Sequence, residues 1–133
     1  MSAVAVDTHT IVWYLSNDNR LSGRAIDALD RASAAGEYIY VPSICLVELT
    51  YLVEKARLPA IARERLIRAL DEPSTPCKIA PLDREVADAL ELVDRNEVPD
   101  MPDRVVAATA FALKVPLISR DGKIRSSKRE TFW

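Results

Sequence analysis

The sequence predicts an α/β protein with a short, mainly parallel sheet flanked by helices. Four short apolar segments typical of buried strands alternate along the chain with segments of helical periodicity. The connections between them are long enough to hold helices, as right-handed crossovers between parallel strands require. The length of 133 residues fits a single domain over residues 1–133 with a core of its own.

The predicted elements follow one another without a repeat or a linker. The predicted strands cover residues 2–6, 38–41, 77–80 and 115–119. The predicted helices cover residues 9–15, 22–35, 43–57 and 59–70, a segment that begins at 83, and residues 103–114. The segment 71–76, with two prolines, separates the fourth helix from the third strand.

Capping residues place several of the helix ends. Ser22 is a plausible N-cap, and Gly36 ends the same helix, which is expected to turn Ile26 and Leu29 toward the core. Asp83 is expected to cap an amphipathic helix with Val86, Leu90 and Val93 on one face. Pro102 lies near the start of the alanine-rich last helix, a position that favours helix initiation.

The bulk properties indicate a cytoplasmic protein with no membrane partner. The N-terminus lacks a basic start, and no apolar run approaches the ~20 residues that span a bilayer. Cys45 and Cys77 lie in apolar contexts without metal-binding spacing, which favours two buried, reduced thiols.

Charge is distributed unevenly along the chain. The net charge is −2, but residues 1–113 carry −6 and residues 114–133 carry +4. A basic tail beside an acidic body can bind phosphates, although a solvated terminus explains the same charges. The basic residues considered as contacts for a phosphate backbone are Arg104, Lys114, Arg120, Lys123 and Arg125.

Two aspartates are expected at the carboxyl ends of strands. Asp7 directly follows the first predicted strand, and Asp121 comes two residues after the last one. Ligand sites of open parallel sheets form at this edge. Taken singly, each aspartate is also a plausible helix cap or turn residue.

Glu48 is harder to explain as a surface charge. Thr50, Glu54 and Arg57 form the polar face of its predicted helix, and Glu48 points some ~160° away from Thr50. A carboxylate on that side is expected to be partly buried. Burial requires compensation, by a cation or by a buried pair with an arginine or with Lys55.

Asp100 and Asp103 bracket the start of the alanine-rich helix. One of them can cap the helix while the other favours its dipole. Asp103 shares a face with Ala107 and Ala110, whose small side chains let a sheet approach closely, so Asp103 is the better candidate for an inward-pointing carboxylate.

Several carboxylates in one cleft call for a cation. Two like charges ~4 Å apart cost roughly 4 kcal/mol at an effective dielectric constant near 20, and a divalent ion removes that cost. Oxygen ligands suit Mg²⁺ or Mn²⁺, and His9 is the single histidine, so the usual zinc ligands are lacking. The chemistry that these residues indicate is metal-assisted hydrolysis of a phosphoester.

Four segments together resemble the PIN-domain family, in particular the VapC ribonuclease toxins of type II toxin–antitoxin systems. Asp7-Thr-His-Thr resembles the first motif and Val41-Pro-Ser-Ile-Cys-Leu-Val-Glu48 the second. Asp100-Met-Pro-Asp103 resembles the third, and Leu117-Ile-Ser-Arg-Asp121 the fourth. The resemblance covers nearly the whole chain, with the motifs in the family's order and spacing.

The resemblance implies a PIN-like α/β/α sandwich, an endoribonuclease dependent on Mg²⁺ or Mn²⁺, an RNA substrate, a cognate antitoxin and a homodimer. It makes Asp7, Glu48 and Asp103 the core acidic residues and Asp121 the fourth, with Asp100 ranked lower. It also places at position 119 a serine that can steady the first aspartate.

Rival functions fit the residues less well. A phosphatase of the haloacid-dehalogenase kind needs a second aspartate two residues after the first, where this chain has His9. A phospho-accepting signalling domain needs an acidic pair and a late lysine that are not found. A catalytically inactive binding module on the same fold stays open as an alternative. The helix over 43–57 and the pair Trp13–Tyr14 are either core or a surface for a partner.

Overall fold

The computed structural model describes residues 3–121 and 131–133. Its strands are β1 (Val4–Val6), β2 (Ile39–Pro42), β3 (Cys77–Ala80), β4 (Leu117–Ile118) and β5 (Thr131–Phe132). Its helices are α1 (Thr8–Leu15), α2 (Gly23–Ala34), α3 (Ser43–Glu54), α4 (Ala60–Asp71), α5 (Arg84–Ala89), the 3-10 helix η1 (Leu90–Leu92) and α6 (Met101–Leu113). None of the described helices is long and apolar enough to cross a membrane.

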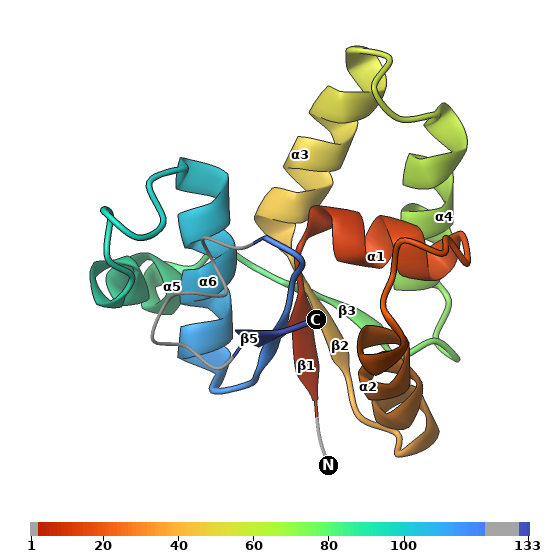
Figure 1. Cartoon of the computed structure of the whole chain (residues 1–133), viewed down its shortest axis with the longest axis horizontal. Helices are drawn as coiled ribbons and strands as arrows, with labels where there is room; N and C mark the ends of the chain where they lie inside the picture. Colours follow the sequence, from red (N-terminus) through yellow and green to blue (C-terminus); the bar gives the residue numbers. More distant parts are fainter. Residues whose placement is uncertain (1–2, 122–130) are drawn as a thin grey trace.

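The strands form one parallel sheet in the order β3-β2-β1-β4-β5. The chain builds outward from β1 to β2 and β3, then returns to the other side of β1 for β4 and β5. The strand order therefore reverses between β1 and β4, and ligands of such sheets bind in the crevice beyond the carboxyl ends at this point. In Figure 1, α5 and α6 lie on one side of the sheet and α1 and α2 on the other.

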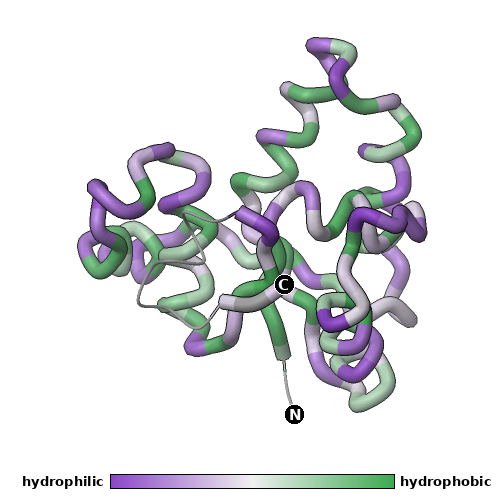
Figure 2. Tube along the Cα trace, in the orientation of Figure 1, coloured by the Kyte–Doolittle hydropathy of each residue, from purple (hydrophilic) through white to green (hydrophobic). Residues whose placement is uncertain are grey.

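The core is formed by β1 and the elements packed on its two faces. All three residues of β1 are buried, as expected for a strand covered on both faces. Every residue from 105 to 110 in α6 is buried, and Ala107 and Ala110 are fully so. Their small side chains let α6 approach the sheet closely. Figure 2 shows the hydrophobic trace concentrated in the central strands, with hydrophilic segments at the periphery.

The predicted fold class and most of the predicted elements are confirmed. Ser22 caps α2 through a bond from Ala25 N (3.0 Å), Asp83 caps α5, and Gly36 adopts a φ of +72° after α2. Glycine reaches that conformation without steric cost.

Several details of the predicted elements are wrong. Ile26 is 36% exposed, because the buried stripe of α2 consists of Ala25, Leu29 and Ala32. The helix predicted from residue 83 tightens into η1 after Ala89. The strand predicted over residues 115–119 has only two residues, and Pro116 cannot donate to a neighbouring strand. The helix predicted over residues 43–57 ends at residue 54.

The strand β5 was not predicted from the sequence. It holds two residues at the end of a basic tail and pairs with β4 in parallel. So short a strand has no periodicity that a sequence pattern can reveal.

Enlarging Ala107 tests the close packing of α6 on the sheet. We expect Ala107→Leu to lower the free energy of unfolding by about 1–3 kcal/mol, because the extra atoms have no space between α6 and β1. Ala60→Leu, at an exposed position of α4, is the matched control and is expected to change stability by no more than about 0.5 kcal/mol. Urea unfolding of both variants measures the difference, and equal stability would contradict this view of the core.

Candidate functional site

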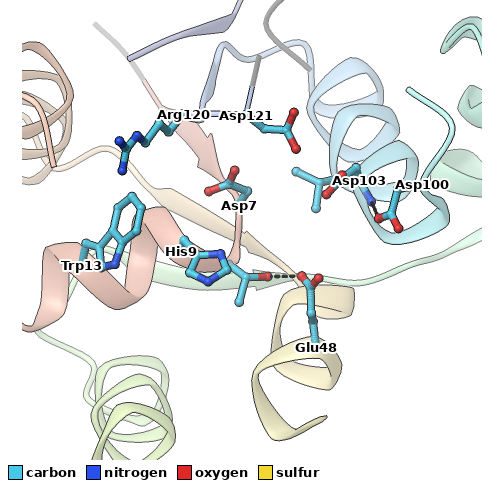
Figure 3. A pocket seen from close by; sticks show the side chains of 10 residues that line it. Asp7, His9, Trp13, Glu48, Asp100, Asp103, Arg120 and Asp121 are labelled. Carbon is cyan, nitrogen blue, oxygen red and sulfur yellow. Dashed lines mark hydrogen bonds between the residues drawn. The ribbon is translucent and has the colours of Figure 1, made fainter. Parts of the chain in front are cut away.

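A pocket of about 580 Å³ opens at the carboxyl ends of β1 and β4 (Figure 3). Five carboxylates line it, namely those of Asp7, Glu48, Asp100, Asp103 and Asp121. They come from the ends of β1 and β4, from α3 and from the start of α6. The structure therefore brings together in one pocket all the acidic residues predicted from the sequence.

Asp7 both caps a helix and lines the pocket. Its Oδ1 accepts hydrogen bonds from the backbone N–H of Thr10 (3.1 Å) and from the Thr10 hydroxyl (2.6 Å), which makes Asp7 the N-cap of α1. Its Oδ2 accepts a bond from the Ser119 hydroxyl (2.5 Å). The capping explanation of this residue is correct, and it also fixes the carboxylate at the pocket wall.

Ser119 connects the two strand ends of the site. It is fully buried, and its hydroxyl donates to Asp7 while accepting a bond from the backbone N–H of Asp121 (3.0 Å). The register of β1 and β4, which pairs Val6 with Ile118, places Ser119 beside Asp7. One hydroxyl thus orients a carboxylate after β1 and the backbone of the acidic residue after β4.

Glu48 is compensated by a threonine. It is half-buried, as its helical position predicted, and its Oε1 accepts a hydrogen bond from the buried Thr8 hydroxyl (2.5 Å; Figure 3). Lys55, one of the two suggested partners, instead lies over the Tyr51 ring at 5.7 Å. No salt bridge joins Glu48 to an arginine among residues 3–121 and 131–133. Within the described residues, Glu48 therefore faces the pocket without a cationic partner.

The two aspartates at the start of α6 have different roles. Asp100 is exposed and is the N-cap, accepting a bond from the backbone N–H of Asp103 (3.2 Å). Asp103 is half-buried and faces Asp121 across the pocket (Figure 3). The sequence favoured Asp103 as the inward-pointing carboxylate, and the structure agrees, with Asp100 as the cap.

Asp103 has a carboxyl group whose pKa is raised within the cluster. Burial raises the pKa of its carboxyl group to about 7, with further contributions from the charges of Asp121 and Asp100, a side-chain hydrogen bond with Asp121, and the charge of Glu48. Like charges held close together disfavour ionisation of one member. The cluster therefore holds more negative charge than the pocket alone can stabilise at neutral pH.

The donor set fits a hard divalent cation. All the acidic donors are carboxylate oxygens, which suits Mg²⁺ or Mn²⁺. Within the described part of the chain, no three Asp, Glu, His or Cys side chains already converge on one metal position. Magnesium fits such a site, because it commonly keeps several waters and is held by only one or two carboxylates together with substrate phosphates.

The opposite side of the pocket is basic and aromatic. Arg120 is exposed, lines the pocket and lies with its guanidinium carbon 5.8 Å from the centre of the Trp13 ring. His9 is exposed beside the same tryptophan, at 5.5 Å between ring centres. Trp13 itself is only 8% exposed, so it belongs to the core rather than to a surface for a partner.

Two of the other basic residues considered for phosphate binding, Arg104 and Lys114, lie away from the pocket. The Arg104 guanidinium donates to the carbonyl groups of Leu90 and Val93, at 2.9 Å each, so it caps η1 instead of facing a ligand. Lys114 follows the last turn of α6 and precedes β4, at the edge of the sheet opposite the site. Lys123 and Arg125 lie outside the described residues.

Sequence reasoning missed the two threonines that hold the carboxylates. Thr8 and Thr10 are buried, and they bind Glu48 and Asp7 respectively. A signal was present: two hydroxyl residues stand one and three positions after an aspartate at a strand end. The bond from Thr8 to Glu48 spans 40 residues, and only the fold reveals it.

Three comparisons relate the chain to known proteins. The chain is 29% identical over 137 residues to "Ribonuclease VapC22" of Mycobacterium tuberculosis, with the whole length of both proteins covered. Its fold matches VapBC2 from Rickettsia felis, a structure bound to a promoter DNA fragment, with a TM-score of 0.71 and 19% identity over 98% of this chain and 97% of that one. It also matches FitAcB from Neisseria gonorrhoeae, with a TM-score of 0.64 and 22% identity over 98% and 96% of the two chains.

The family assignment rests on a match to almost the whole chain. The model of the PIN domain matches residues 4–129, a range that includes β1, β4 and every carboxylate of the pocket. This agrees with the resemblance of the four acidic motifs and with the parallel sheet. The chain belongs to the PIN domain family.

Proposed function

We propose that this protein is a metal-dependent endoribonuclease that acts as the toxin of a toxin–antitoxin pair. The observation that carries the proposal is the gathering of Asp7, Glu48, Asp103 and Asp121 in one pocket at the switch point of a parallel sheet. A curated relative of full length is a ribonuclease, which supports RNA as the substrate class.

In the proposed site, Mg²⁺ or Mn²⁺ is held by Asp7, Asp103 and Glu48, with Asp121 as a direct or water-mediated ligand and Asp100 ranked below them. A bound ion of this kind polarises a phosphoester and lowers the pKa of water. It would also offset the burial of the Asp103 carboxylate and the repulsion by its neighbours, which together raise the pKa of that group. Three hydroxyl groups orient the carboxylates without binding the ion: that of Thr8 donates to Glu48, and those of Thr10 and Ser119 donate to Asp7. Loss of such an orienting bond typically costs ~10–100-fold in metal affinity or activity.

The chain's own residues orient the substrate and accept the proton of the attacking water. Carboxylate oxygens of the pocket are the available acceptors, because His9 is the single histidine and lies on the opposite side from Asp103 (Figure 3). Arg120 contacts the RNA backbone, which positions the strand without reading its sequence. Lys123 and Arg125, which follow it in the basic tail, remain candidates for the same role.

A cognate antitoxin and a homodimer are part of the proposal. Two solved structures with this fold are described as a VapBC complex from Salmonella typhimurium and a toxin–antitoxin complex from Klebsiella pneumoniae. On α3, Val47 and Tyr51 are 53% and 59% exposed at a spacing of four residues, which supports this helix as a contact for a partner. An arginine of the antitoxin entering the acidic pocket would compete with the cation for the same carboxylates.

Cleavage of RNA by the purified protein tests the proposed activity. We expect a total bacterial RNA pool to yield discrete fragments with Mg²⁺ or Mn²⁺ and none with EDTA. Asp7→Asn should lower the cleavage rate by about 100-fold or more, because even residues that only orient metal ligands contribute up to about that much. Asparagine still caps helices well, so α1 should stay folded.

Asp27→Asn, at an exposed position of α2, is the matched control and should cleave at the wild-type rate. Metal-dependent cleavage that survives Asp7→Asn would contradict the proposed site. A wild-type protein that is folded and free of antitoxin, yet binds no metal and cleaves nothing, would instead favour the inactive binding module.

The free energy of unfolding of the metal-free protein, measured as a function of pH, tests the cost of ionising Asp103 within the cluster. The folded-state pKa of Asp103, about 7, lies above its unfolded value of 3.8, so folding is favoured when this group is protonated. The contribution of the protonated Asp103 to the free energy of unfolding is complete below pH ~4 and is lost as the pH rises through ~7. In EDTA, Asp103→Asn should therefore be more stable than the wild type at pH 8 and similar to it at pH 4.

At pH 8 we expect the free energy of unfolding of Asp103→Asn to exceed that of the wild type by about 2 kcal/mol. This is roughly half of the value that the pKa difference implies, because the side chain is partly exposed to screening solvent. Thermal unfolding at a series of pH values measures it. A variant no more stable than the wild type at pH 8 would show that the pocket tolerates its charges without a cation.

A further inference from the structure

The pocket has a second side that the acidic cluster does not use. In Figure 3, Arg120 and Trp13 lie on one side, Asp103, Asp100 and Glu48 lie on the other, and Asp7 and Asp121 stand between them. The neighbours Arg120 and Asp121 point in opposite directions, although their Cα atoms are only ~3.8 Å apart. One pocket therefore offers a region for a metal-bound phosphate and, beside it, a region of opposite charge.

Arg120 has a charge available for a ligand. Two arginines lie over the Trp13 ring, Arg20 at 5.0 Å and Arg120 at 5.8 Å. The Arg20 guanidinium is neutralised by Asp18, which accepts bonds of 3.0 and 2.7 Å from it. Among the described residues, no carboxylate forms a salt bridge with Arg120, whose guanidinium lies over the tryptophan ring. A stacked, unpaired guanidinium at the edge of a pocket is suited to bind phosphate.

His9 forms the exposed end of a cluster of aromatic rings. Its ring centre lies 5.5 Å from that of Trp13 at an angle of 46° between the planes, and Trp133 meets Trp13 edge-on at 5.7 Å. Trp13 is 8% exposed and Trp133 is partly buried, so the tryptophan rings support His9 while the imidazole itself faces solvent at the pocket. Supported aromatic rings beside a cation are the elements with which proteins bind single-stranded nucleic acids.

We propose that His9 and Arg120 form a nucleotide subsite for single-stranded RNA, next to the acidic cluster. Arg120 binds the phosphate adjacent to the one that is cleaved, and His9 stacks against the base of that nucleotide. This inference rests on the proposed nuclease function and specifies how the substrate lies. It requires a single strand, because the bases of a duplex are not free to stack on a side chain. It also makes binding tolerant of sequence, since every base has a face that can stack.

Tryptophan fluorescence provides a direct probe of this subsite. The chain has two tryptophans, and both belong to the ring cluster beneath His9. The full-length Asp7→Asn protein, which is expected not to cleave, is titrated in Mg²⁺ with an oligouridylate of roughly ten nucleotides, within the ~4–16 nucleotides that single-strand-binding folds cover. Binding should change the fluorescence, and a duplex of the same length should bind more weakly.

Substitution of Arg120 separates a phosphate contact from a structural role. Arg120→Gln in this background should weaken binding about tenfold and reduce the slope of log K against log salt by about 0.7, the value for one lost phosphate contact on a single strand. Arg120→Lys should keep the slope. Arg31→Gln, an exposed arginine of α2 near the opposite edge of the sheet, is the matched control and should change neither quantity.

Substitution of His9 tests the stacking contact. His9→Ala should weaken binding about tenfold with an unchanged salt slope, and His9→Phe should restore the affinity because it keeps a ring. In the otherwise wild-type enzyme, Arg120→Gln and His9→Ala should raise KM with little change in kcat. A kcat lost in His9→Phe would show proton transfer by His9 and overturn the stacking role.

The subsite would be overturned if Arg120→Gln bound RNA with the affinity and salt slope of Arg31→Gln, or if His9→Phe bound as weakly as His9→Ala. Cleavage by the wild type separates this failure from that of the proposed function. Cleavage that does not depend on Arg120 and His9 would refute the subsite but not the nuclease activity. RNA binding that depends on Arg120, without metal-dependent cleavage, would refute the nuclease activity but not the subsite.

Discussion

The pairing of β1 with β4 determines the rest of the site. Because Val6 lies opposite Ile118, the chain leaves both strands at the same level, and Asp7 comes to lie beside Ser119. A shift of one residue would turn Ser119 to the opposite face of the sheet and break its bond to Asp7. The register is well determined, since the residues of both strands are buried. The hydrophobic core thus fixes the position of a polar cluster that would not assemble by itself.

The cluster is held together by bonds that do not remove its charge. Threonine and serine hydroxyls donate to Asp7 and Glu48, but a neutral donor leaves the net negative charge in place. The consequence appears at Asp103, where burial and neighbouring carboxylates raise the pKa to about 7. A protein selected for stability alone would replace or pair such groups, and strongly perturbed carboxyl groups in a pocket are typical of functional sites.

The sequence predicted the parts of this protein that depend on local patterns. Short apolar strands, helix caps such as Ser22, and the burial of Glu48 all follow from periodicity and residue type. The roles of Thr8 and Arg104 could not be predicted, because their partners lie 40 and 11–14 residues away and depend on how the helices pack. Lys114 was misjudged for a similar reason. It is near the basic tail in sequence, but α6 carries it to the far edge of the sheet.

In the proposed site, burial and neighbouring negative charges disfavour the ionised carboxylates until a divalent cation binds between them. Calorimetric titration of the purified, antitoxin-free protein with Mn²⁺ at pH 6.5, in buffers of different ionisation enthalpy, measures how many protons are released when the cation binds. Because Asp103 with a pKa of about 7 is roughly three-quarters protonated at that pH, we expect Mn²⁺ binding to release about three-quarters of a proton, and binding by Asp103→Asn to release almost none. Binding without proton release, or no binding by the wild-type protein, would contradict this expectation.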